Sequence, residues 1–181
     1  MAAFAAGDDE AFVRLYRKYR DRMVSFSRRL LGDVAQAEEA AQDVFLKLYD
    51  ARQRYQPTSR FSTFLYRIAT NHCLNLRARH DHRLTDRGVI AEEHAQVAAS
   101  QSEAVADGEL RAALTAALTR LPERQRAALV LCHHEGLSYQ EAATAVGVSV
   151  SAIKSLVHRA RESMSEMMRP FLEATEVDHA V

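Results

Sequence analysis

The chain has 181 residues, of which 48% are hydrophobic and 27% charged, and its formal net charge at pH 7 is zero. It exceeds a typical domain of roughly 100–150 residues, so it admits either one large domain or two small ones. Because it has only 6 glycines and 3 prolines, it is poor in the turn residues that all-β folds use, and we expect a mostly helical protein.

Targeting and metal-binding patterns are missing from the sequence. The residues after Met1 form no apolar run of signal-peptide length, and nowhere do about 18 apolar residues follow one another, as a membrane span needs. Cys73 and Cys132 have no CxxC partner, so their spacing supports neither a disulfide framework nor a structural zinc site. We therefore expect a cytoplasmic protein with reduced cysteines, no membrane insertion, and no metal or other cofactor.

The first half of the chain is predicted to be a run of helices. From residue 8 to residue 31 apolar side chains return every three or four positions, and Gly32 ends this pattern. Asp33 is placed to cap the next helix, with Gln36 three residues on, and the apolar period then continues to Tyr49.

A loop and a basic helix follow. The period breaks at residues 56–59 and resumes from Phe61 to Leu76, where we expect Phe64 to be buried. The neutral net charge conceals a strong local imbalance: residues 52–83 contain seven arginines and one acidic residue, whereas residues 84–110 contain six acidic residues and one arginine. The acidic stretch lacks periodicity and is predicted to be a linker.

A second helical unit begins near residue 109 and contains a helix-turn-helix pattern. Pro122 fits the first turn of a helix that ends near Gly136. Ser138 and Glu141 then form a capping-box pattern at the start of a short helix that stops at Gly147, and the next helix restarts after Ser149. Two helices joined by a turn of about three residues that contains glycine are the helix-turn-helix layout.

The last helix has one apolar and one polar face. Its apolar positions recur at helical spacing and must pack inward: Val150, Ile153, Val157, Ala160 and Met164. Hydroxyl groups near its start can reach base edges in a major groove, and cations further along can neutralise phosphates. A solvated surface helix is the simpler alternative, but the capped helix before it favours DNA binding. The candidate DNA-binding residues are Ser151, Lys154, Ser155, His158, Arg159 and Arg161.

The second unit resembles the fourth conserved region of bacterial sigma factors. The resemblance is carried by the stretches 121–126, 136–143, 147–149 and 154–161. In that family this module reads the −35 promoter element. One departure is Leu156, where many members have arginine, so the resemblance carries over no contact at that position.

The first unit resembles the second conserved region of the same family. In residues 37–49 the match is to an acidic, leucine-bearing helix that docks on the β′ coiled coil of RNA polymerase. A solvated face with one stray leucine is the simpler interpretation without the resemblance. The resemblance implies that the polymerase-binding residues are Gln42, Asp43, Leu46 and Lys47.

Residues 61–75 resemble the family segment that captures the −10 element, and the loop of residues 54–62 corresponds to the one that receives a flipped-out base. Single-stranded bases stack on aromatic rings and are tracked by cations, and Tyr55, Phe61 and Tyr66 lie among arginines here. The simpler alternative is that Phe61, Phe64 and Tyr66 are core. The predicted −10 residues are Tyr55, Arg60, Arg67, Asn71, Asn75, Arg77 and Arg79.

Together these matches predict an all-α protein with two small helical domains joined by a flexible linker. Residues 1–83 correspond to sigma region 2, 84–108 to the linker, 109–170 to region 4, and 171–181 to a tail. The short length and the missing middle region of larger sigma factors indicate the extracytoplasmic-function group. The resemblance implies three partners: core RNA polymerase, through its β′ coiled coil and β flap, promoter DNA, and an anti-sigma factor. It also implies association with the nucleoid when bound to polymerase.

Two other classes of function remain open at this point. An enzyme would need a nucleophile or a metal, but the candidates at residues 72–73 and 132–134 are adjacent on helices and point about 100° apart, so we expect no catalytic residue. A stand-alone helix-turn-helix regulator explains the second unit and leaves the basic aromatic segment unexplained. A further hypothesis is that the acidic linker screens the basic DNA-binding surface of the free protein.

Overall fold

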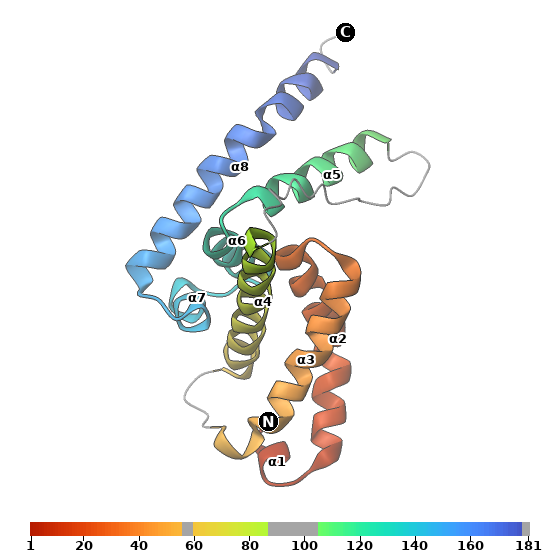
Figure 1. Cartoon of the computed structure of the whole chain (residues 1–181), viewed down its shortest axis with the longest axis vertical. Coiled ribbons are helices and arrows are strands. Elements are labelled where there is room, and N and C mark those ends of the chain that lie inside the picture. Colours follow the sequence, from red (N-terminus) through yellow and green to blue (C-terminus); the bar gives the residue numbers. More distant parts are fainter. Residues whose placement is uncertain (56–59, 87–104, 179–181) are drawn as a thin grey trace.

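A computed structural model describes residues 1–55, 60–86 and 105–178, which form helices and connecting turns with no strand among them (Figure 1). The expected linker falls largely on residues 87–104, outside this described part. The helices are α1 (Ala2–Ala5), α2 (Asp9–Leu31), α3 (Val34–Asp50), η1 (Arg52–Arg54), α4 (Phe61–Asp86), α5 (Val105–Arg120), α6 (Glu123–Leu129), η2 (Val130–His134), α7 (Tyr139–Val146) and α8 (Val150–Asp178).

The first unit is formed by α1–α4, and the predicted end of α2 and the predicted cap of α3 are both present. Gly32 adopts the left-handed conformation at the end of α2, with φ of +83°. The Asp33 side chain accepts a hydrogen bond from the Gln36 backbone N–H at 2.7 Å, which caps α3. The helices enclose a core of side chains at helical spacing, which includes Phe26, Val44 and Leu48.

The second unit is formed by α5–α8. Ser138 caps α7, and the Glu141 carboxylate accepts a hydrogen bond from the Ser138 backbone N–H, so both halves of the predicted capping box are present. Gly147 ends α7 in the left-handed conformation, and the Ser149 hydroxyl caps α8 by accepting a hydrogen bond from the Ala152 N–H. The helix-turn-helix predicted from the sequence is confirmed.

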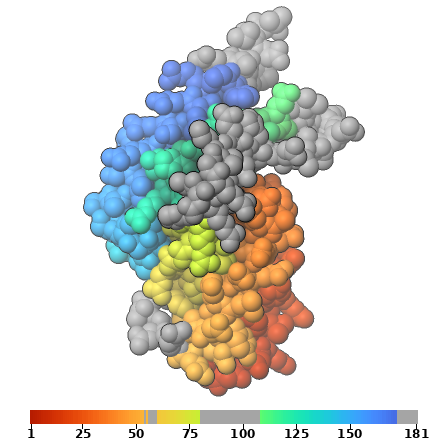
Figure 2. Space-filling view, viewed as in Figure 1, coloured from red at the N-terminus to blue at the C-terminus, as the bar shows by residue number. Residues whose placement is uncertain are grey.

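The two units share one hydrophobic core. α4 lies between them, with α2 and α3 on one side and α6 and α7 on the other (Figure 1). The space-filling view shows the first unit, in red to yellow, in direct contact with the second, in teal to blue (Figure 2). The approach is close enough that a Cβ atom at Gly32 would lie 2.9 Å from the Thr119 side chain, so a larger residue would have to displace that side chain as well as adopt a positive φ.

Arg126 is a buried, charged residue where the first and second units meet. Only 1% of it is exposed, and its guanidinium donates hydrogen bonds to the backbone carbonyls of Leu30, at the end of α2, and of Thr119 and Leu121. Carbonyls at the C-terminal end of a helix have no partner within the helix and carry partial negative charge. The Arg126 cation therefore joins the second unit to the end of α2.

One core prediction is wrong. Phe64 is half-buried, because its ring lies at the edge of the unit against Tyr55, 5.1 Å away between ring centroids, and beneath the Arg67 guanidinium. Tyr66, predicted among the DNA-stacking rings, is instead buried beside Phe26 at a centroid distance of 5.1 Å. Within the described residues, no helix is long and apolar enough to cross a membrane.

Candidate nucleic-acid interface

The polar face of α8 is exposed along the predicted DNA-binding positions. Val150 and Met164 are half-buried, while Ile153, Val157 and Ala160 are buried, so the inward face is the predicted one. All six candidate DNA-binding residues are exposed: Ser151, Lys154, Ser155, His158, Arg159 and Arg161. With α7 packed against it, α8 presents this face as the second helix of a helix-turn-helix.

Three of these side chains have partners within the chain. The hydroxyl groups of Ser151 and Ser149 lie 3.0 Å apart and share a hydrogen bond. His158 lies 3.0 Å from Glu162, one helical turn further on. Arg161 contacts Nε2 of His133 in η2 through its Nε atom at 3.0 Å and through a second guanidinium nitrogen. The contact with His133 could not be predicted from the sequence, because 28 positions separate the two residues.

Of the predicted −10 residues, Tyr55 and Arg60 lie between η1 and α4, and the others lie on α4. Arg60, Arg67, Asn71, Asn75 and Arg79 are exposed, and Tyr55 is half-buried. Arg77 is also half-buried and forms a salt bridge with Glu123 of α6 at 3.1 Å. In this structure the Arg77 guanidinium is therefore paired with a carboxylate of the second unit.

Acidic residues of the second unit meet other members of this segment. Glu141 lies 3.7 Å from Arg60 and accepts a hydrogen bond from the Thr63 hydroxyl at 3.4 Å. Hydrogen bonds from Ser138 lower the pKa of Glu141, and Arg60 adds to this effect, so the carboxylate is charged. The Tyr66 hydroxyl donates a hydrogen bond to the Glu135 carboxylate. Burial is the main cause that raises the pKa of Tyr66, and this hydrogen bond is the second.

The predicted polymerase-binding residues lie on the outer face of α3. Gln42, Leu46 and Lys47 are exposed, and Asp43 is half-exposed. Leu46 is the most exposed large apolar side chain of the described residues, at 64%. The Leu46 side chain is therefore accessible to a partner protein.

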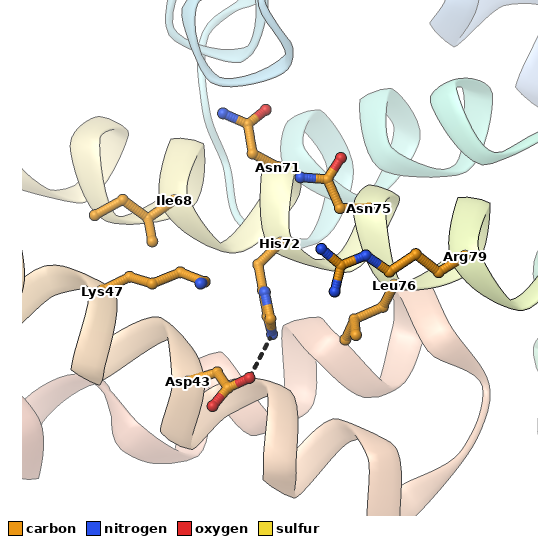
Figure 3. Close-up of a pocket in the computed structure, with 8 residues that line it drawn as sticks. All are labelled: Asp43, Lys47, Ile68, Asn71, His72, Asn75, Leu76 and Arg79. Atoms are coloured by element: carbon orange, nitrogen blue, oxygen red, sulfur yellow. Dashed lines mark ion pairs between the residues drawn. The ribbon is translucent and has the colours of Figure 1, made fainter.

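Asp43 and Lys47 also line a pocket between α3 and α4, where they meet residues of the predicted −10 set (Figure 3). The floor is His72, which is only 9% exposed and places Nε2 3.2 Å from an Asp43 carboxylate oxygen. Burial lowers the pKa of His72, and the Asp43 charge partly opposes this, so the ring is neutral near pH 7. The pocket thus brings residues of the predicted polymerase-binding set and of the predicted −10 set together around His72, which was in neither set.

Neither cysteine has the lowered pKa of a reactive thiol. Cys73 is buried and donates to Ser27, and burial raises the pKa of its thiol to about 11. Burial also raises the pKa of Cys132. Across the described part of the chain, no three histidine, cysteine, aspartate or glutamate side chains are grouped as a metal site requires.

Comparison with protein families gives two matches, one in each unit. A family model described as Sigma-70 region 2 matches residues 15–83, and one described as Sigma-70, region 4 matches residues 111–164. The RNA polymerase sigma-H factor of Pseudomonas aeruginosa is 34% identical over 92% of this chain and 90% of its own length. The ECF RNA polymerase sigma factor SigW of Bacillus subtilis is 30% identical over 90% of this chain and 91% of its own.

Solved structures share the fold. The sigma factor RpoE of Bartonella quintana, solved in complex with the anti-sigma factor NepR, superposes with a TM-score of 0.74 at 24% identity over 88% of this chain and 98% of that one. CnrH, solved in complex with the cytosolic domain of CnrY, superposes with a TM-score of 0.68 at 23% identity over 93% and 95% of the two chains. At these identities the likeness concerns the fold alone.

Proposed function

The chain belongs to the sigma-70 family as an extracytoplasmic-function sigma factor, and from that premise we propose which of its surfaces serve each step of initiation. As a member of this family it binds core RNA polymerase and directs transcription from specific promoters. The main support for this proposal is that the chain exposes two separate polar helix faces, one on α8 and one on α4. Each face is held in place by the packing of its helix against other helices.

The α8 face reads the −35 element. Ser151 and Ser155 near the start of the helix approach base edges, while Lys154 and the arginines beyond it contact phosphates. His133 holds Arg161 at one edge of this face. The support is the exposure of all six residues and the match of this segment to region 4.

The α4 segment captures the −10 element as a single strand. Tyr55 offers a half-exposed ring for stacking, Arg60 and Arg67 track the backbone, and Asn71 and Asn75 face bases. In the packed arrangement seen here, Glu141 and Glu123 of the second unit occupy Arg60 and Arg77. Capture of the strand therefore requires these two ion pairs to exchange for phosphates.

Leu46 of α3 anchors the chain on the β′ coiled coil of polymerase, and the second unit contacts the β flap. The exposure of Leu46 among polar neighbours supports the first contact. We place the protein in the cytoplasm, with the nucleoid when it is bound to polymerase. Its work is binding, with no catalytic residue of its own.

An anti-sigma factor holds the chain inactive until a signal arrives. RpoE and CnrH, which share its fold, were each solved with a partner of their own, and NepR is an anti-sigma factor. Overproduction of the chain beyond its partner should then start transcription from its promoters without any signal. Unchanged transcript levels after overproduction would contradict this control.

Mapping transcript starts tests the function as a whole. Genomic DNA of the source bacterium is transcribed by its sigma-free core enzyme with and without the purified chain, and the 5′ ends are sequenced. We expect starts that depend on the chain and share one sequence near −35 and another near −10. Tight sequence-specific binding by the free chain, with no new starts, would instead identify a stand-alone helix-turn-helix regulator.

A further inference from the structure

Arg161 on the polar face of α8 is held by a residue from outside that helix. α6 packs against α8 and leads into η2, the π-helical turn that carries His133. The His133 Nε2 atom lies 3.0 Å from the Arg161 Nε atom and 2.6 Å from one of its terminal nitrogens. Single π turns in helical segments are rare and frequently lie at functional sites. This turn places His133 at the edge of the predicted DNA-binding face.

The contact determines which side of the Arg161 guanidinium is turned outward. Arginine can only donate, so the His133 Nε2 atom accepts both hydrogen bonds, and the ring is neutral with its proton on Nδ1. The donors that remain are on the two terminal nitrogens of the guanidinium, on the side away from the His133 ring. Donors on two nitrogens of one guanidinium can bind two oxygens of one phosphate.

A neutral partner orients Arg161 without cancelling its charge. Among the residues that the structure describes, no carboxylate forms a salt bridge with Arg161. The adjacent acid, Glu162, lies 3.0 Å from His158 instead. A carboxylate in place of the His133 ring would also hold the guanidinium, but its negative charge would offset the attraction between Arg161 and DNA.

Arg161 lies on the same face of α8 as two other predicted DNA-binding residues. Lys154 and His158 precede it by about two turns and one turn of the helix, and all three side chains are exposed. Phosphate contacts fix the position and orientation of a DNA-binding helix, although they carry no sequence information themselves. An oriented Arg161 would therefore hold α8 in register on the duplex while residues nearer the start of the helix read bases.

We propose that His133 is a positioning residue for promoter binding, which orients the Arg161 guanidinium toward one phosphate of the −35 duplex and leaves its charge intact. This inference rests on the proposed −35 function of α8. It adds to that function a residue that precedes the helix-turn-helix and acts on DNA only through Arg161.

Neutral backbone linkages test this role in the intact holoenzyme. Wild-type and variant holoenzymes are titrated with duplex fragments of a mapped promoter that carry one methylphosphonate at successive linkages of the −35 element. Wild type should lose affinity at one linkage to which Arg161→Gln is insensitive, and His133→Ala should lose less than wild type there. His134→Ala is the matched control, because His134 is an exposed histidine on the same turn, and it should behave as wild type.

The unmodified duplex separates orientation from charge. Arg161→Gln should lower the salt slope by about 0.9, the value for one phosphate on B-DNA. His133→Ala should bind about fivefold more weakly with the wild-type salt slope, because the cation is still present but no longer held in one conformation. His133→Gln keeps an acceptor oxygen on its side chain and should bind within about twofold of wild type.

A double variant distinguishes positioning from other effects of the histidine. In the Arg161→Gln background, His133→Ala should cause no further loss of affinity. A further loss there overturns the proposal, as does wild-type affinity of His133→Ala or an equal loss in His134→Ala. If Arg161→Gln itself keeps the wild-type affinity and linkage profile, the proposed −35 contact of Arg161 has failed.

Discussion

Replacement of Arg126 by methionine should destabilise both units at once. The guanidinium is 1% exposed and donates to three backbone carbonyls, one of which, Leu30, belongs to the first unit. Methionine fills part of the volume but leaves these acceptors without a donor, at about 1–3 kcal/mol for each buried unsatisfied group. Allowing for relaxation, the loss should be about 4 kcal/mol, in line with breaking a buried charged contact.

Thermal unfolding followed by circular dichroism measures this effect. For a chain of about this length, 1 kcal/mol shifts Tm by about 2–4 °C, so Tm should fall by roughly 8–16 °C. Arg124→Met is the matched control, because Arg124 is exposed on the same helix and should change Tm by less than about 2 °C. Equal Tm values for the two variants would refute the view that the buried cation holds the units together.

Three further changes probe single contacts. Ser138→Ala removes the α7 cap and should lower the unfolding free energy by about 1 kcal/mol in urea titrations, whereas an unchanged midpoint would argue against the capping box. Leu46→Glu should weaken core-polymerase binding at least tenfold, about 1.4 kcal/mol, while Val34→Glu, at 56% exposure on the same helix, should not; equal losses would remove Leu46 as an anchor. Burial lowers the pKa of His72 in the folded chain below its usual value of 6.5. As the pH falls, His72 is therefore protonated in the unfolded chain before it is protonated in the folded chain, and the folded state loses free energy of unfolding below that pH. His72→Gln should lose less stability than wild type between about pH 7.5 and 5.5 in urea titrations, and a larger loss would reverse the inferred sign.

Contacts between neighbours in the chain could be predicted from the sequence. The caps at Asp33 and Ser138 need only residues three positions apart, and helical spacing alone identifies the buried face of α8. Gly147 could be read as a stop because the left-handed conformation is favoured by glycine.

Contacts between the units could not be predicted in this way. Arg126 has the pattern of a surface cation, but it is buried against carbonyls of its own unit and against Leu30 of α2. Periodicity did not distinguish Phe64 from Tyr66, because both lie on α4 next to apolar residues. Tyr66 is covered by Phe26 of α2 and meets Glu135 of the second unit, whereas Phe64 lies at the edge of the first unit against Tyr55. His72 likewise gains its role from Asp43, 29 positions earlier in the chain on another helix.

Run-off transcription on a mapped promoter tests the sigma-factor function most directly. Sigma-free core enzyme is incubated with the template alone, with the chain, and with the chain carrying Leu46→Glu, while binding of the free chain to the same DNA is measured in parallel. We predict a specific transcript only with the wild-type chain, a much weaker one with the variant, and weak binding by the free chain. No transcript with wild-type chain, together with tight specific binding of the free chain, would contradict a sigma factor.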